Sequence, residues 1–167
     1  WEFGDGYTSE DQFPSHIYDE PGLYSVTLTV YNGSLNDSMI RTDYIDVRVD
    51  IPDANFRFAI NETLGYVDPE VYTHMPTVEE MAAILSLDKP GYGISDITGA
   101  EYLVNCQFLN LSNNFISDIS PLAELMQINE LYLQNNAISD ITPLGFYAET
   151  EVIALSGNLI STPAVLG

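Results

Sequence analysis

The sequence is poor in basic residues, and this scarcity excludes whole classes of partner. Its 167 residues include 4 lysines and arginines against 25 aspartates and glutamates, giving a formal net charge of −21. The acidic residues are spread along the chain, so no segment forms an acidic tail. A surface of this charge repels phosphate backbones and anionic lipids. We therefore expect no nucleic-acid partner.

Residues that build catalytic and redox sites are also scarce. The one cysteine, Cys106, cannot form a disulfide within the chain. The sequence has two histidines, His16 and His74, and lacks the motifs of serine hydrolases, zinc proteases and nucleotide-binding loops. We expect a protein that is not an enzyme, with both histidines in structural hydrogen bonds and Cys106 as a small buried apolar residue.

Long apolar runs are absent as well. No run reaches the roughly 18 residues that a membrane helix needs, so we expect no membrane span in this fragment. The sequence opens on Trp1 inside an apparent strand, and we expect the natural N-terminus to lie further upstream.

The most informative feature present is a repeat with a period of 22 residues. The pentapeptide Ile-Ser-Asp-Ile-Thr at 94–98 recurs with small changes at 116–120 and 138–142, and a fourth copy begins at 160. Three interior positions keep the same period: Leu109, Leu131 and Ile153; Leu111, Leu133 and Leu155; Asn114, Asn136 and Asn158. A fixed period of this length predicts a solenoid, with the aliphatic residues inward and the asparagines bonded to turn backbone.

Two helices are predicted before the repeats, over residues 53–87. In the first, Phe56, Ala59, Ile60 and Leu64 share one face, with Asp53 as N-cap and Gly65 after the end. The second opens with a capping box of Thr77 and Glu80, and its predicted apolar face comprises Val78, Met81, Ala82 and Leu85.

Residues 1–50 are predicted to be β structure. Apolar and polar residues alternate over 23–30 and 44–49, and residues 1–3 indicate a shorter strand. We expect six side chains to face inward: Trp1, Phe3, Tyr24, Val26, Leu28 and Val30.

The repeats resemble leucine-rich repeats of the internalin type. The pattern is Leu-x-x-Ile-x-x-Leu-x-Leu-x-x-Asn at 125–136, followed by Ile-Ser-Asp-Ile-Thr-Pro-Leu at 138–144. The resemblance implies an α/β solenoid with a parallel sheet over 94–167, and a helical N-terminal cap over 51–93. In the third copy, Tyr147 and Thr150 stand where Leu125 and Ile128 stood.

Residues 1–50 resemble the C-terminal part of a PKD domain, an immunoglobulin-like β-sandwich. The matching residues are Trp-Glu-Phe-Gly-Asp-Gly at 1–6, His16 and Tyr18, and the alternating run from Gly22 to Val30. The resemblance implies a partial sandwich whose first strands would precede Trp1. The predicted fold is therefore multi-domain, and the combination implies a bacterial or archaeal protein that is extracellular or on the cell surface.

Four aspartates are weighed as calcium ligands. Asp96, Asp118 and Asp140 recur once per repeat, and Asp5 lies in a Gly-Asp-Gly turn. Calcium takes about 6–8 oxygen ligands, which one carboxylate per coil does not supply. We favour capping and turn-forming roles, with no metal site and Asp5 as the one weak candidate.

The outward side chains of the repeat strands are the best candidates for function. They alternate with the inward residues and should form one concave face. The candidates for ligand binding are Phe108, Asn110, Glu130, Tyr132, Gln134 and Val152. We expect a non-catalytic binding or adhesion module that recognises a protein or a glycan. An architectural stalk, or an accessory region of a secreted enzyme, is the alternative.

Overall fold

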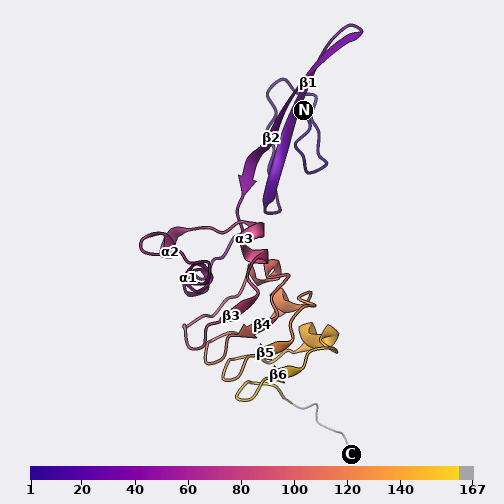
Figure 1. Cartoon of the computed structure of the whole chain (residues 1–167). Coiled ribbons are helices and arrows are strands. Elements are labelled where there is room, and N and C mark those ends of the chain that lie inside the picture. Colours follow the sequence, from indigo (N-terminus) through magenta and orange to yellow (C-terminus); the bar gives the residue numbers. More distant parts are fainter. Residues whose placement is uncertain (162–167) are drawn as a thin grey trace, which may run out of the picture. The chain divides into compact units, whose positions relative to one another are not determined.

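The computed structural model describes residues 1–161, so the predicted end of the repeats at 162–167 lies outside the described residues. The chain divides into two compact units, Trp1–Arg48 and Val49–Gly167. Figure 1 shows a long hairpin in the first unit, and helices followed by a ladder of short strands in the second.

The first unit is built on a hairpin of β1 (Gly22–Asn32) and β2 (Leu35–Val47), which pair antiparallel. The predicted strand at 23–30 lies within β1. By contrast, β2 begins well before the predicted start at residue 44, because the polar run at 36–38 hides its alternation. Residues 1–3 lie beside β1, where Glu2 and Thr27 exchange backbone hydrogen bonds of 2.8 and 2.9 Å.

Few side chains of this hairpin unit are buried. Phe3 is buried, and Trp1, Tyr24, Val26 and Leu28 are half-buried, as expected for inward residues. The prediction for Val30 was wrong, because its side chain is 53% exposed. A two-stranded sheet covers too little surface to bury apolar side chains along its whole length.

Three helical segments open the second unit: α1 (Ala54–Thr63), α2 (Glu70–Thr73) and α3 (Val78–Ala82). The predicted N-cap Asp53 is confirmed, since one carboxylate oxygen accepts the N–H groups of Asn55 and Phe56. Its other oxygen accepts the N–H and hydroxyl of Ser95 and the N–H of Asp96. One side chain therefore starts α1 and fixes the first repeat turn.

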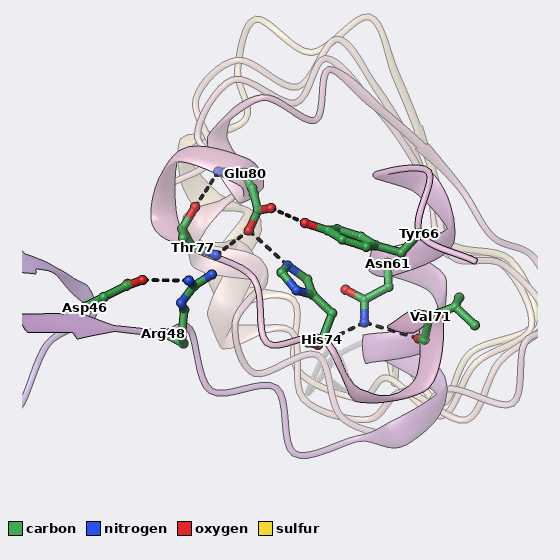
Figure 2. A network of polar contacts seen from close by, with 8 residues as sticks. All are labelled: Asp46, Arg48, Asn61, Tyr66, Val71, His74, Thr77 and Glu80. Carbon is green, nitrogen blue, oxygen red and sulfur yellow. Dashed lines mark hydrogen bonds and ion pairs between the residues drawn. The ribbon is translucent and has the colours of Figure 1, made fainter. Parts of the chain in front are cut away.

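A polar network joins α3 to the segment that follows α1 (Figure 2). The predicted capping box is present, with the Glu80 carboxylate accepting the Thr77 N–H at 2.8 Å. The same carboxylate accepts the Tyr66 hydroxyl at 2.5 Å and lies 3.0 Å from His74 Nε2. The Tyr66 and His74 rings stack at 3.9 Å between centroids. Burial alone would raise the pKa of Glu80, but these hydrogen bonds lower it to about 2.

The helix at α3 is shorter than the sequence indicated. It ends at Ala82, and Leu85, predicted on its apolar face, is 57% exposed. The parallel sheet begins directly afterwards with β3 (Ser86–Asp88), inside the stretch 51–93 that was predicted to be helical. Leu87 is buried in β3 as Leu109 is in the next strand.

The sheet continues as β4 (Phe108–Asn110), β5 (Glu130–Tyr132) and β6 (Val152–Ala154), all parallel and in the order β3-β4-β5-β6. Each residue pairs with the residue 22 positions later, for example Leu109 with Leu131. Short 3-10 helices lie between the strands, at Ala100–Tyr102, Ser120–Leu122 and Thr142–Phe146. The period read from the sequence is thus the step from strand to strand.

One hydrophobic core runs from the helices through the coils. It contains Phe56 and Met81 of the helical segment and Leu109, Leu131 and Leu133 of the repeats, all with no exposed side chain surface. In the third copy, polar atoms replace part of the apolar packing: the Tyr147 hydroxyl donates to the Leu122 carbonyl and that of Thr150 to the Ile128 carbonyl. The prediction that Ile153 is buried like Leu131 was wrong, because its side chain is 39% exposed on β6, the last strand of the described sheet.

The buried asparagines bond one coil to the next, as predicted. The Asn136 side-chain oxygen accepts the Ile116 N–H at 3.0 Å, and its amide nitrogen donates to the carbonyls of Leu111 and Leu133. Asn114 and Asn158 make the corresponding contacts one coil earlier and one coil later. These side chains supply hydrogen bonds to backbone groups that turn away from the strand ladder.

The first coil departs from the repeat where it contacts the helices. Lys89 and Tyr92 occupy the positions of Leu111 and Asn114 one repeat later. Lys89 Nζ lies 2.6 Å from a carboxylate oxygen of Glu62 in α1, and the Tyr92 hydroxyl donates to the same oxygen at 2.7 Å. These residues therefore bond to the helical segment instead of to a preceding coil.

Truncation of Leu133 tests the inward register of the repeats. We expect Leu133→Ala to lower the free energy of unfolding by about 2–5 kcal/mol, because it leaves a cavity in a closely packed core. Urea denaturation followed by circular dichroism measures the loss. Leu159→Ala, at a side chain that is 67% exposed, is the control and should cost less than about 0.5 kcal/mol. Equal losses in the two variants would show that the register is wrong.

The Glu80 network should make stability depend on pH. Because the folded-state pKa of about 2 lies below the ordinary 4.5, the stabilisation is complete above pH 4.5 and is lost as pH falls towards 2. We expect Glu80→Gln to lower the free energy of unfolding most at about pH 7, and by progressively less below about pH 4.5. Urea denaturation across this range measures the difference. The exposed Glu79→Gln is the control, and a cost for Glu80→Gln that stays constant with pH would contradict the network.

Candidate ligand-binding face

The outward side chains of β3 to β6 form one surface, which we call the sheet face. It is the surface predicted to be concave. Because the strands are in register, Phe108, Glu130 and Val152 are neighbours in one row. Asn110 and Tyr132 are neighbours in a second row. The structure thus brings the predicted strand residues together, and all five are half-buried while the central leucines are fully buried.

An aromatic pair and a carboxylate occupy the middle of the sheet face. The rings of Phe108 and Tyr132 lie 5.6 Å apart between centroids at an angle of 44°. The Tyr132 hydroxyl donates a 2.8 Å hydrogen bond to Glu130, and this bond raises the pKa of Tyr132. The two rings and the carboxylate therefore hold one another in place on adjacent strands.

Asn110 is fixed on both sides of its amide. Its nitrogen donates to Asp88 at 2.8 Å, and its oxygen accepts the N–H and the hydroxyl of Ser112. Sequence reasoning missed Asp88, because β3 was not recognised as a strand. The signal was present: Leu87 and Ile94 lie one period before Leu109 and Ile116. It was masked because Lys89 and Tyr92 replace the leucine and asparagine that mark a repeat.

Gln134 continues the face two residues beyond the end of β5. Its side chain is half-buried, and its Oε1 atom has no hydrogen-bond partner among the described residues. Its backbone carbonyl accepts the Asn113 N–H at 2.8 Å, which fixes the residue against the preceding coil. This oxygen atom is buried, so it is enclosed by the fold and does not face solvent.

The sheet face has acidic residues and no basic ones. Asp88 and Glu130 lie on strands β3 and β5, and none of the residues in β3 to β6 is lysine or arginine. The two basic residues of 51–167 have partners elsewhere. Lys89 pairs with Glu62, and Arg57 donates to the Ile51 carbonyl.

The recurring aspartates serve the turns. Asp96, Asp118 and Asp140 each accept the N–H of the residue two positions later, at 2.8 to 2.9 Å. This is the capping role that the sequence analysis favoured over calcium binding. Within residues 1–161, no group of three or more His, Cys, Asp or Glu side chains is placed to hold a metal ion.

The other titratable candidates are tied into local structure. Asp5 lies 2.6 Å from His16 Nε2 and accepts the Tyr7 N–H. Burial acts to raise the pKa of Asp5, but these bonds lower it overall. The His16 ring stacks on Phe3 at 4.2 Å. Cys106 is fully buried, as predicted, and burial raises the pKa of its thiol to about 11.

Comparison with known proteins agrees with both resemblances. Residues 1–47 match the family model of the PKD domain, and residues 104–145 match that of leucine-rich repeats in two copies. A stretch of 42 residues, 25% of this chain and 4% of the relative, is 45% identical to the collagenase ColA of Bacillus cereus.

Two similar solved structures come from Listeria monocytogenes. An internalin, InlF, is 35% identical with a TM-score of 0.62, over 67% of this chain and 32% of the internalin. The functional domain of InlJ is 24% identical with a TM-score of 0.58, over 68% of this chain and 24% of InlJ, and shows the shared fold. This chain thus spans about a third or less of each relative. It carries a PKD-type segment followed by internalin-type leucine-rich repeats.

Cys106 tests whether the repeats hold a reactive thiol. The thiol is buried and donates to the Phe108 carbonyl at 3.2 Å, so a small disulfide reagent should reach it only after unfolding. We expect labelling at about pH 8 to be at least about 100-fold slower in buffer than in denaturing urea. The measurement is the rate of thiolate release from the reagent, and comparable rates in both conditions would contradict the buried, inert thiol.

Proposed function

We propose that this chain is a non-catalytic recognition module that binds a protein or a glycan through its sheet face. The supporting observation is the pair of rows of half-buried residues on adjacent strands, which meet at the contact between Phe108 and Tyr132. Strands that are packed in register present side chains with little freedom to lose, so binding costs little ordering entropy.

The distribution of sequence variation between the coils supports the same face. The turn residues Ser95, Ser117 and Ser139 are identical in successive copies, and so are the aspartates that follow them. By contrast, the single repeat position that Phe108 occupies holds four different residues in β3 to β6, namely Ser86, Phe108, Glu130 and Val152. Uniform turns serve the stacking of coils, whereas a varied face allows recognition of a particular shape and chemistry.

The helical segment is assigned a structural part in this proposal. Phe56 and Met81 belong to the same buried cluster as Leu87 of the first coil. The end of a solenoid exposes its hydrophobic core to water unless another segment covers it. Residues 51–83 therefore act as the N-terminal cap, which keeps the first coils folded and with them the sheet face. As part of this proposal, we assign the module a location outside the cell or on its surface, which the similarity of its repeats to those of an internalin supports. None of the helices in the described part is long and apolar enough to cross a membrane.

A second candidate function is that of an accessory region in a secreted enzyme. The similarity of 42 residues to a collagenase favours it. In that case the chain would act as a spacer or as a substrate-binding attachment. A purely architectural stalk is the third reading, in which the sheet face has no ligand.

Truncation of Tyr132 tests the assignment of the face. We expect Tyr132→Ala to weaken binding by about 1–3 kcal/mol, because an aromatic anchor in the centre of the face is lost, with little change in melting temperature. Binding is measured by glycan-array screening and by pull-down from envelope extracts, with wild type beside the variant. Phe115→Ala removes an aromatic ring that is 70% exposed outside the strands and is the matched control. A partner that binds all three proteins equally would contradict the proposal.

A further inference from the structure

The centre of the sheet face combines three features that together select a ligand chemistry. Two aromatic rings lie in contact, a carboxylate is fixed beside them, and no basic side chain stands on β3 to β6 to neutralise it. Aromatic faces attract cations through the electrostatic field of their π electrons, and a neighbouring carboxylate adds direct attraction. The cluster of Phe108, Glu130 and Tyr132 therefore has the composition of a cation subsite.

The geometry keeps the carboxylate available at this place. Glu130 accepts the Tyr132 hydroxyl at 2.8 Å, which fixes its position beside the rings. A carboxylate has about four acceptor sites, so this bond leaves capacity for the N–H groups of a ligand. Phe108 and Glu130 are register partners on adjacent strands, which stand about 5 Å apart. One guanidinium or ammonium group can therefore contact a ring and the carboxylate together.

Both cations and sugars bind to aromatic and acidic side chains, and the charge of the molecule decides between them. Residues 51–167 carry 15 acidic and 2 basic residues, and both basic side chains face partners within the fold. A field of one sign steers oppositely charged surfaces to the site and raises their rate of association. A neutral sugar gains nothing from this field, so the observations favour a cationic protein.

We propose that the cluster of Phe108, Glu130 and Tyr132 receives an arginine or lysine side chain of a basic protein partner. This inference rests on the proposed function, because it names the partner class of the same face. The guanidinium or ammonium group lies over an aromatic ring and donates to Glu130. Asn110 flanks the subsite as the register partner of Tyr132 on the adjacent strand.

The test uses the whole chain, labelled with nitrogen-15, and a capped pentapeptide with two arginines separated by glycine. The matched probe is the same peptide with citrulline, which keeps the shape of arginine without its charge. We expect the arginine peptide to shift the amide signals of 108–110 and 130–132 in a saturable way. The citrulline peptide should bind roughly 3- to 10-fold more weakly.

Two variants separate the subsite from general charge attraction. Glu130→Gln should weaken binding of the arginine peptide by about 3- to 10-fold. Glu124→Gln removes the same charge from an exposed position outside the strands, and it should change the affinity by less than about twofold. Equal effects of the two variants, or shifts spread over acidic residues on all faces, would overturn the subsite.

The remaining outcomes distinguish this inference from the proposed function. If a neutral tetrasaccharide shifts these same amides and the arginine peptide does not, the cation subsite is wrong and the sheet face remains a binding face. If neither probe shifts them, the cation subsite is also wrong, and the Tyr132→Ala experiment alone decides the proposed function. If a natural partner is retained equally by wild type and Tyr132→Ala, both fail.

Discussion

The second unit depends on how each coil satisfies the backbone groups of its turn. Strand hydrogen bonds end where the chain leaves the sheet, and the groups beyond them are buried too deeply to meet water. Asn114, Asn136 and Asn158 supply the missing partners, each accepting an N–H from the coil before and donating to carbonyls of that coil and its own. A buried amide with these contacts fixes the spacing between coils, and the aliphatic core then fills the space that remains.

The repeat pattern is interrupted at two places, next to the helices and in the third copy, and different contacts replace it at each place. Where the first coil contacts the helices, Lys89 and Tyr92 replace a leucine and an asparagine and converge on Glu62 of α1. Asp53 adds a second link by starting α1 and holding the turn at Ser95. Where the third copy departs from its consensus, hydroxyl groups of Tyr147 and Thr150 bond to carbonyls of the preceding coil. Polar contacts between elements take over wherever the apolar repeat is interrupted.

The sequence predicted the parts that follow from periodicity or from local capping. The 22-residue step gave the register of the strands, and short motifs located the start of α1 and the capping box at Thr77. It missed β3 and Asp88, because the residues that contact the helices no longer obey the repeat. It placed Val30 inward because alternation reports which face a side chain takes, but not whether anything covers that face.

For the candidate face too, the sequence predicted some features and not others. Alternation within each strand predicted that Phe108, Glu130 and Tyr132 point outward, and the period predicted that they are neighbours. The bond from Tyr132 to Glu130 and the contact between the rings depend on side-chain rotamers, which no sequence pattern specifies.

The equal spacing of the asparagine contacts has a consequence for how such a repeat array changes in evolution. Each interior coil repeats the same two sets of contacts: its asparagine side chain bonds to the backbone of the coil before it, and its own backbone bonds to the asparagine of the coil after it. A whole coil of 22 residues can therefore be duplicated or lost without leaving an unpaired group at the junction between neighbouring coils. By contrast, the loss of a few residues puts that coil out of register with its neighbours. Duplication lengthens the sheet by one strand at a time, and each new strand carries outward positions that are free to diverge. Recognition can in this way be altered by copying existing coils, with no need for a new fold.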